Sequence, residues 1–354
     1  MNATALSRTG QVGIADLERF DEIIDVRSPG EFAEDHIPGA LNCPVLDDAQ
    51  RAEVGTLYTQ ASPFAAKKLG AALIARNIGD HLLSRFIDRP KTWKPVVYCW
   101  RGGMRSAALV TVLRSVGWAA GQLDGGYKTY RRAVIERLEE LPARFAFRVL
   151  CGPTGSAKTR VLQALGERGE QIVDLEALAC HKGSVLGVLP DQPQPSQKWF
   201  ESALAAALAA CDPARPVYVE AESRKIGRLQ IPESLLRAMR GARCLVVEAE
   251  FAARVDFLLR DYAYFIADPG LMKARLQVLQ GIQSKETLAR WAGLADEGIW
   301  PTLVGELLAA HYDPLYHRSQ GAHFAGFADP QRYATADLSA AGISELAGRI
   351  AAKD

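Results

Sequence analysis

A cysteine and an arginine are separated by five residues in the stretch VVYCWRGGMRS (96–106). The apolar run before Cys99 predicts a strand, and the residues from Ser106 onward predict a helix. Glycines allow backbone N–H groups to turn into such a loop, and the start of the helix adds positive potential. The pattern therefore predicts an anion-binding loop in which Cys99 is a nucleophilic thiolate and Arg105 holds an oxyanion. The other loop residues are Trp100, Arg101, Gly102, Gly103, Met104 and Ser106.

The same loop has a structural alternative, namely a core cysteine at the end of a strand beside a glycine turn. We favour the anion loop because the cysteine, both glycines, the arginine and the serine all stand where such a loop requires them. The carboxyl end of a strand in a parallel sheet is also where ligands commonly bind.

A second glycine-containing loop lies in CGPTGSAKT (151–159), between an apolar run and a predicted helix. Its spacing is typical of a P-loop, whose backbone N–H groups surround a diphosphate while a lysine offsets the charge. Ala157 stands where the common pattern has glycine; alanine can take helical angles, so we expect the loop to persist. A chance glycine turn before a helix is the alternative. The expected diphosphate-binding residues are Gly152, Thr154, Gly155, Ser156, Ala157, Lys158 and Thr159, with Thr159 as a candidate ligand of Mg²⁺.

Acidic residues follow two further apolar runs, QIV and VYV, where strands are expected to end. Carboxylates at these positions could hold a metal ion or act as acid or base beside the P-loop. A structural role is equally open for them. Neither run gives a strong Walker B pattern, so nucleotide hydrolysis is not predicted and no metal site is certain. The candidates are Asp174, Glu176, Glu220 and Glu222.

Basic side chains gather in the segments ACHKGSVLG, QPSQKW and ESRKIGR. Such residues bind RNA phosphates, although a solvated surface explains any one of them as well. The candidates for RNA binding are His181, Lys182, Lys198, Arg224, Lys225 and Arg228. The later segment HYDPLYHRS could stack on bases, but packing is the favoured interpretation of its His311, Tyr312, Tyr316 and Arg318.

The composition is that of an ordinary globular chain. Its 354 residues are 48% hydrophobic and 23% charged, and the net charge of +1 creates no global attraction to nucleic acid or membrane. The start of the chain lacks a signal-peptide pattern, and no apolar run is long enough for a membrane helix. The six cysteines form no CxxC pair, which disfavours a zinc site or a disulfide scaffold. We expect a cytoplasmic protein with no membrane contact.

Two successive α/β regions are expected to carry the two loops. The first has predicted strands in EIIDV, ALNCPV, KPVVYCW and AGQL, and predicted helices over 47–86, 106–118 and after the Gly-Gly turn at 125–126. The pattern restarts at RFAFRVLCG and continues with QIVDLEAL, PVYVEAESR and ARCLVVEAE, before a mostly helical part after about Phe251. Strands alternating with helices imply parallel sheets. We place the boundary near 138–146, which gives domains of residues 1–140 and 141–354.

The surroundings of the first loop resemble a rhodanese domain. IIDVRSPGEFAEDHIPGALNCPV is similar to the N-terminal rhodanese segment, and LDGGYKTYRR is similar to the closing one. CWRGGMRS also fits the Cys-x2-Gly-x2-Arg-Ser pattern of tyrosine phosphatases, with Tyr98 in place of their preceding histidine. The common rhodanese loop is one residue shorter, so this loop has room for a larger anion, such as a phosphate that bears selenium.

Taken in order, the motifs resemble the tRNA 2-selenouridine synthase family, in which a rhodanese domain is fused to a P-loop domain. The resemblance covers nearly the whole chain and rests on CWRGGMRS, CGPTGSAKT, DLEALACHKGS, QPSQKWFE, VYVEAESRKIGR and HYDPLYHRS. It implies an α/β protein: an N-terminal rhodanese-like parallel-sheet domain, then a P-loop NTPase-like α/β domain with a mostly helical C-terminal part.

The resemblance also implies a chemistry. The family replaces sulfur by selenium at wobble-position 2-thiouridine of tRNA, using selenophosphate, and attaches a geranyl group to that sulfur from geranyl diphosphate. Geranylation would come first, because a thiocarbonyl sulfur leaves poorly until it is alkylated. Cys99 would serve the selenium step, and Lys158 and Thr159 would serve the diphosphate. The implied partners are this tRNA, the two small co-substrates and the enzyme that produces selenophosphate.

Three other functions fit parts of the sequence. A Cys-x5-Arg phosphatase would leave the P-loop domain without a task. A P-loop kinase with a regulatory rhodanese module requires tight binding of magnesium and ATP, which Ala157 and the missing Walker B pattern disfavour. A tRNA-binding protein without catalysis predicts that Cys99 is dispensable. Candidates for contact with a geranyl tail, which core packing explains equally well, are Trp199, Phe200, Tyr262, Tyr264 and Phe265.

Overall fold

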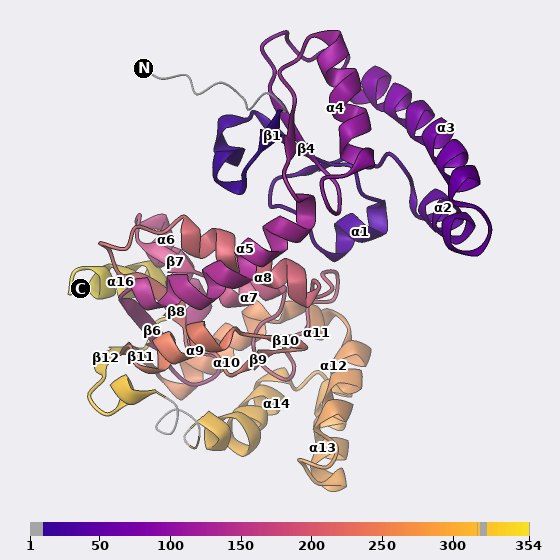
Figure 1. Cartoon of the computed structure of the whole chain (residues 1–354). Helices are drawn as coiled ribbons and strands as arrows, with labels where there is room; N and C mark the ends of the chain where they lie inside the picture. Colours follow the sequence, from indigo (N-terminus) through magenta and orange to yellow (C-terminus); the bar gives the residue numbers. More distant parts are fainter. Residues whose placement is uncertain (1–9, 317, 319–323, 354) are drawn as a thin grey trace. The chain divides into compact units, whose positions relative to one another are not determined.

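The computed structural model describes residues 10–316, 318 and 324–353. The chain divides into two compact units (Figure 1). One unit runs as far as Arg137 and includes Glu201–Ala203, and the other comprises Leu138–Phe200 and the chain from Leu204 onward. Residues 1–9, which belong to the stretch that lacks a signal-peptide pattern, lie outside the described part.

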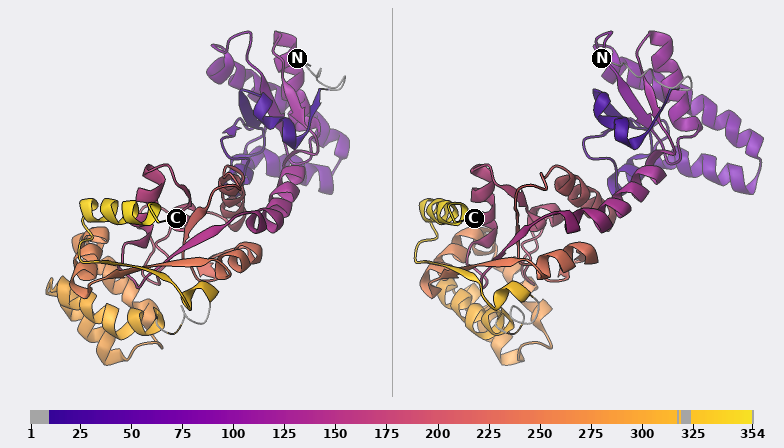
Figure 2. Two further views of the ribbon diagram at one scale, coloured as in Figure 1. Left: turned by 90° about the vertical axis from the view of Figure 1, so that its left-hand side faces the viewer. Right: turned by 60° about the vertical axis from the view of Figure 1, so that its left-hand side comes forward.

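The first unit is built on a five-stranded parallel sheet with the strand order β1-β5-β4-β2-β3, surrounded by helices (Figure 2). β4 lies in the middle and all of its residues are buried. The strands are β1 (Gln11–Val12), β2 (Glu22–Asp25), β3 (Leu41–Asn42), β4 (Pro95–Tyr98) and β5 (Gly121–Leu123). The helices are η1 (Ile14–Arg19), α1 (Pro29–Glu34), α2 (Asp48–Gln60), α3 (Pro63–His81), η2 (Leu82–Phe86), α4 (Met104–Val116) and α5 (Gly126–Glu140).

Local sequence explains where these helices begin and end. The single helix predicted over 47–86 is divided into α2 and α3, because the Ser62 side chain accepts the Ala65 N–H and caps α3, while Pro63 takes the first helical position. α4 ends as predicted at Gly117, whose φ of +112° is left-handed. The core of the unit packs β2 and β4 against α4 around Phe86, Trp93 and their neighbours.

The second unit contains another five-stranded parallel sheet, in the order β12-β11-β6-β8-β7, and a separate antiparallel hairpin, β9–β10. The strands are β6 (Phe147–Cys151), β7 (Gln171–Val173), β8 (Val217–Glu220), β9 (Lys225–Ile226), β10 (Leu229–Gln230), β11 (Arg243–Ala249) and β12 (Gln331–Thr335). The helices are η3 (Leu141–Arg144), α6 (Lys158–Glu167), α7 (Leu175–Ala179), α8 (Gln197–Ala209), α9 (Glu233–Arg240), α10 (Phe251–Asp261), α11 (Ala263–Ala267), α12 (Pro269–Leu276), η4 (Gln277–Leu279), α13 (Lys285–Asp296), α14 (Trp300–Leu307), η5 (Leu308–Tyr312), η6 (Ala325–Phe327) and α16 (Ala340–Ala351).

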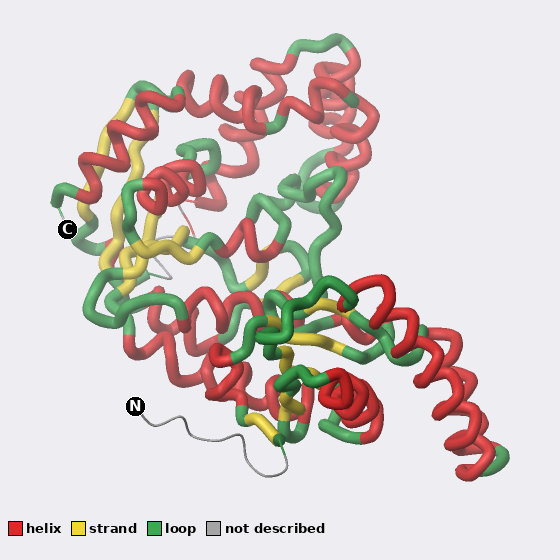
Figure 3. The backbone as a smooth tube through the Cα atoms, turned by 90° about the horizontal axis from the view of Figure 1, so that it is seen from above, coloured by secondary structure: helices red, strands yellow, loops and turns green. Residues whose placement is uncertain are grey.

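Two apolar clusters hold this unit together. In one, α6 and α16 pack against the sheet. In the other, the helices from α11 to α14 surround Trp291, and Leu186 packs with them (helices are red in Figure 3). β12 is a strand that the sequence analysis missed, because among its residues only Tyr333 is buried and the segment QRYAT lacks an apolar run. Within the described residues, none of the helices is long and apolar enough to cross a membrane.

Candidate functional site

Cys99 directly follows β4, the middle strand of the first sheet, and is 3% exposed. The chain then turns through Gly102 at a φ of +63°. An added Cβ there would lie 2.8 Å from the Leu123 carbonyl oxygen, so the turn requires glycine. α4 begins at Met104, which brings the positive end of the helix to the loop.

Hydrogen-bond donors converge on the Cys99 sulfur. The Gly103 N–H donates to Sγ at 3.2 Å, and the Ser106 hydroxyl also lies 3.2 Å from it. The side-chain amide of Gln122 donates to the Ser106 oxygen at 2.9 Å, and the Ser106 hydroxyl has two acceptors within reach, the sulfur and the Gly103 carbonyl at 3.1 Å. Sequence reasoning missed Gln122, since it comes from β5 and no local pattern marks it.

Arg105 contacts a carboxylate in this structure. Its Nη1 donates to Glu31 Oε2 at 2.9 Å, and Glu31 is also the third residue of α1, in a capping box with Ser28. Burial works against ionisation of Glu31, yet the guanidinium holds the pKa of Glu31 below its ordinary value. The predicted role of Arg105 as an anion holder thus stays a prediction, in which an anion would compete with Glu31.

Trp100, Arg101 and Met104 are the remaining large side chains of the Cys99 loop. Met104 is 77% exposed, and Arg101 is also exposed. Trp100 packs against Tyr127, with ring centroids 5.2 Å apart. The Tyr127 N–H donates to the Cys99 carbonyl at 2.8 Å. Trp100 therefore packs on a residue that is itself hydrogen-bonded to the backbone at the cysteine.

The second loop follows β6, the middle strand of the second sheet, and leads into α6. Gly152 and Gly155 have positive φ, and an added Cβ would lie 2.8 Å from the Val247 carbonyl at the first and 2.9 Å from the Leu258 side chain at the second. Ala157 takes left-handed angles, with φ +58° and ψ +27°. The expectation of ordinary helical angles is therefore wrong, because the loop keeps the conformation that favours glycine and the alanine carries the strain.

Lys158 and Thr159 both turn toward the interior of this loop region. The Lys158 ammonium donates to the Gly152 carbonyl at 2.8 Å, and the Thr159 hydroxyl donates to Glu176 Oε2 at 2.7 Å. Burial lowers the pKa of Lys158, although the nearby Glu176 and Glu222 carboxylates oppose that effect. A ligand phosphate would offer Lys158 a charged acceptor in place of a carbonyl.

Glu176 and Glu222 lie together beside Lys158. Gly183 passes directly against both, since an added Cβ would be 2.5 Å from Glu176 Oε1 and 2.6 Å from Glu222 Oε1. Burial raises the pKa of both carboxyls, and with the neighbouring Glu176 charge it brings that of Glu222 to about 8. No group of three or more His, Cys, Asp or Glu side chains suited to a metal ion occurs among the described residues.

The other two predicted acids have structural positions. Asp174 caps α7 by accepting the Ala177 N–H at 2.8 Å. Glu220 is fully buried at the end of β8 and accepts the Glu176 N–H at 2.8 Å. Burial, followed by the neighbouring carboxylates, raises the pKa of Glu220 well above its ordinary value. Glu220 therefore contributes by fixing the backbone of Glu176.

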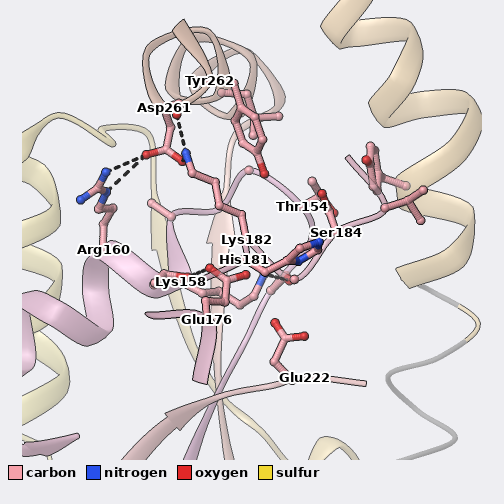
Figure 4. A pocket seen from close by; sticks show the side chains of 18 of the residues that line it. Thr154, Lys158, Arg160, Glu176, His181, Lys182, Ser184, Glu222, Asp261 and Tyr262 are labelled. Atoms are coloured by element: carbon pink, nitrogen blue, oxygen red, sulfur yellow. Dashed lines mark hydrogen bonds and ion pairs between the residues drawn. The ribbon is translucent and has the colours of Figure 1, made fainter. Parts of the chain in front are cut away.

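A pocket of about 600 Å³ opens above the P-loop. At its edge, Asp261 accepts hydrogen bonds from Arg160 at 2.9 Å and from Lys182 at 2.6 Å (Figure 4). The Lys182 ammonium also lies 4.2 Å from the centroid of the Tyr262 ring. Although burial opposes it, the two cations hold the pKa of Asp261 below its ordinary value.

The residues predicted to bind RNA fall in different places. His181 and Lys182 line the pocket, and burial lowers the pKa of His181. Lys198 belongs to the first turn of α8. The three cations of the β9–β10 hairpin are exposed: Arg224, Lys225 and Arg228.

Apolar and aromatic side chains complete the pocket wall. Of the five aromatic residues considered for a geranyl tail, Tyr262 lines the pocket, whereas Phe200 and Phe265 are buried core residues. The wall also contains side chains that the sequence analysis did not assign to a tail, namely Phe257, Leu258 and Leu315, together with His311, Tyr312 and Tyr316 of the HYDPLYHRS segment. Arg318 of that segment is exposed.

Family models match the two regions of the chain that contain the Cys99 loop and the P-loop. Residues 14–133 match the family model of the rhodanese-like domain, and residues 145–284 match that of the tRNA 2-selenouridine synthase AAA domain. The protein is thus a rhodanese-like domain joined to an AAA-type P-loop domain with a helical C-terminal part, and the predicted fold class is confirmed.

Individual relatives then define the family. A tRNA 2-selenouridine synthase of Nitrosomonas europaea is 36% identical over 266 residues, which are 72% of this chain and 68% of the relative. Those of Alcanivorax borkumensis and Bdellovibrio bacteriovorus are 33% and 31% identical, and the matches cover 83% of this chain in each case and 88% and 87% of the relatives. This chain belongs to the tRNA 2-selenouridine synthase family, as its motifs predicted.

Proposed function

We propose that this protein is a cytoplasmic tRNA-modifying transferase that replaces the sulfur of wobble-position 2-thiouridine by selenium. Selenophosphate is the proposed selenium donor, and geranyl diphosphate is the proposed prenyl donor. One observation carries the proposal: a chain of this family has a thiol among anion-loop donors and, separately, a P-loop with lysine, hydroxyl and carboxylate groups. Each loop suits one of two successive steps.

The P-loop is the proposed site of geranylation. The sulfur of 2-thiouridine attacks C1 of the geranyl group, the C–O bond breaks, diphosphate leaves, and N3 of the base loses its proton to solvent. Lys158 and the N–H groups of the loop would hold the diphosphate. The Thr159 hydroxyl and the Glu176 carboxylate are oxygen donors of the kind that Mg²⁺ prefers, and a bound ion would offset diphosphate charge. The apolar wall that includes Phe257 and Leu258 suits the tail.

The Cys99 loop is the proposed site of selenation. Selenium of selenophosphate bonds to C2 of the base, and the C–S bond breaks to release geranylthiol. Cleavage of the Se–P bond then leaves 2-selenouridine. Cys99 would act as a nucleophile that accepts the phosphoryl group as the Se–P bond breaks, and water would then release phosphate from its sulfur. The positive start of α4 suits the phosphate oxygens.

Two macromolecular partners belong to the proposal. The exposed cations of the β9–β10 hairpin suit the phosphates of the substrate tRNA. The enzyme that produces selenophosphate is the second partner, because direct transfer would limit loss of a reactive donor to water. Complex formation on a sizing column with either partner, at low and high salt, tests these contacts.

The experiment that tests the function uses 2-thiouridine tRNA and geranyl diphosphate, with and without selenophosphate, and measures the nucleosides by mass spectrometry. Wild type, Cys99→Ala and Lys158→Ala are compared. Geranylation kept and selenation lost in Cys99→Ala would support two steps on two loops. If the wild type forms no modified nucleoside, the proposal is wrong, and assays for aryl phosphate hydrolysis and ATP turnover would follow.

A further inference from the structure

Arg254 of α10 binds the backbone of the P-loop. Its Nε donates to the Thr154 carbonyl at 2.9 Å, and the residue is only 5% exposed. α10 lies directly against this part of the loop, since an added Cβ at Gly155 would be 3.2 Å from the Arg254 carbonyl and 2.9 Å from Leu258. A buried cation thus holds a peptide group within the loop itself.

The other edge of the guanidinium donates to Asp313. Nη1 and Nη2 of Arg254 donate to the two carboxylate oxygens at 3.1 and 2.6 Å. Asp313 belongs to the segment whose Tyr312 and Leu315 line the pocket. One side chain therefore ties the P-loop to the wall that faces it, and the carboxylate offsets the charge that burial would otherwise make costly.

The direction of the Thr154 carbonyl matters for ligand binding. In a planar trans peptide the C=O and N–H groups point in opposite directions. Holding the Thr154 carbonyl toward α10 therefore directs the Gly155 N–H away from α10, and Thr154 and Gly155 both line the pocket. N–H groups that are already oriented bind phosphate better, because their ordering does not have to occur on binding.

We propose that Arg254 is a positioning residue for phosphate binding, which orients the Thr154–Gly155 peptide while Asp313 holds the guanidinium in place. This inference rests on the proposed phosphate site at the P-loop. It requires arginine, because a lysine ammonium cannot donate in fixed directions to a carbonyl and to both oxygens of a carboxylate at once. Charge alone is therefore insufficient at this position.

The test measures inorganic pyrophosphate binding to the full-length protein by calorimetry at low temperature, for wild type, Arg254→Lys and Lys158→Ala. The matched control is Arg290→Lys, because Arg290 makes the same two-pronged contact with Glu306 at 64% side-chain exposure and outside the pocket. The stoichiometry of binding gives the fraction of the protein that is folded, and the Kd gives the affinity of the folded P-loop site for pyrophosphate. A purely structural role would lower the stoichiometry and leave the Kd unchanged.

We expect Arg254→Lys to raise the Kd about tenfold, the loss expected for one charged hydrogen bond, while Arg290→Lys leaves it unchanged. If wild type binds pyrophosphate and Arg254→Lys binds equally well, the positioning role is wrong and the phosphate site stands. If wild type itself does not bind, or Lys158→Ala binds as tightly as wild type, the phosphate site fails and the inference fails with it.

Discussion

The Arg105 guanidinium lies 2.9 Å from the Glu31 carboxylate, with 17% and 23% of the two side chains exposed. Arg105 stands in the first turn of α4, next to the Cys99 loop, and Glu31 belongs to α1. The carboxylate therefore competes with any anion that needs Arg105. If the loop binds selenophosphate as proposed, Glu31 is expected to weaken that binding.

Removing the Glu31 charge should strengthen the binding of selenophosphate to the Cys99 loop. Glu31→Gln keeps the size of the side chain and removes its charge, so we expect the KM for selenophosphate to fall about threefold, in line with a partly screened ion pair worth below about 1 kcal/mol. Selenation of S-geranylated tRNA measures the KM. The matched control is Glu22→Gln, because Glu22 pairs with Arg89 at 2.8 Å. An unchanged KM in Glu31→Gln, or an equal fall in both variants, would show that Arg105 does not act on the donor.

The same pair predicts a pH dependence of stability. Arg105 holds the pKa of Glu31 below 4.5, its ordinary value, so the folded state binds fewer protons there than the unfolded state. The stabilising contribution is complete above that value and is lost as the pH falls through the lower, folded-state pKa. Urea unfolding should show wild type more stable than Glu31→Gln at about pH 6 and a smaller difference at about pH 3.5. A difference that does not change with pH would contradict this assignment.

The hydrogen bonds to the Cys99 sulfur lead to a prediction for Ser106. Ser106→Ala removes one donor to the sulfur and leaves Gly103 as the other, so we expect selenation to slow by roughly tenfold. Geranylation should stay unchanged, because it is assigned to the P-loop. Single-turnover assays of each step measure the two rates. Ser84→Ala is the control, since Ser84 is exposed and donates to a backbone carbonyl within its own helix region. Equal slowing of both steps would argue against a role at the sulfur.

The sequence predicted the positions of both loops in the fold, because each follows a strongly apolar strand that proved to be the middle strand of its sheet. It could not separate Asp174 from Glu176, which follow the same strand two residues apart. Their roles are decided by α7, which begins at Leu175, so that Asp174 caps the helix and Glu176 faces Thr159. Gln122 and Arg254 also escaped prediction, because each reaches its loop from a distant segment through a contact that only the fold creates.

Ala157 carries a left-handed conformation that glycine would adopt without strain. Ala157→Gly should raise the free energy of unfolding by about 0.5–1 kcal/mol, because relief of the strain exceeds the entropy that glycine adds to the unfolded chain. Urea unfolding followed by tryptophan fluorescence measures it. Ala206→Gly is the matched control, since Ala206 is exposed within α8, where glycine should instead cost about 1 kcal/mol. If both variants are destabilised equally, Ala157 has helical angles in solution and the strain assigned to it does not exist.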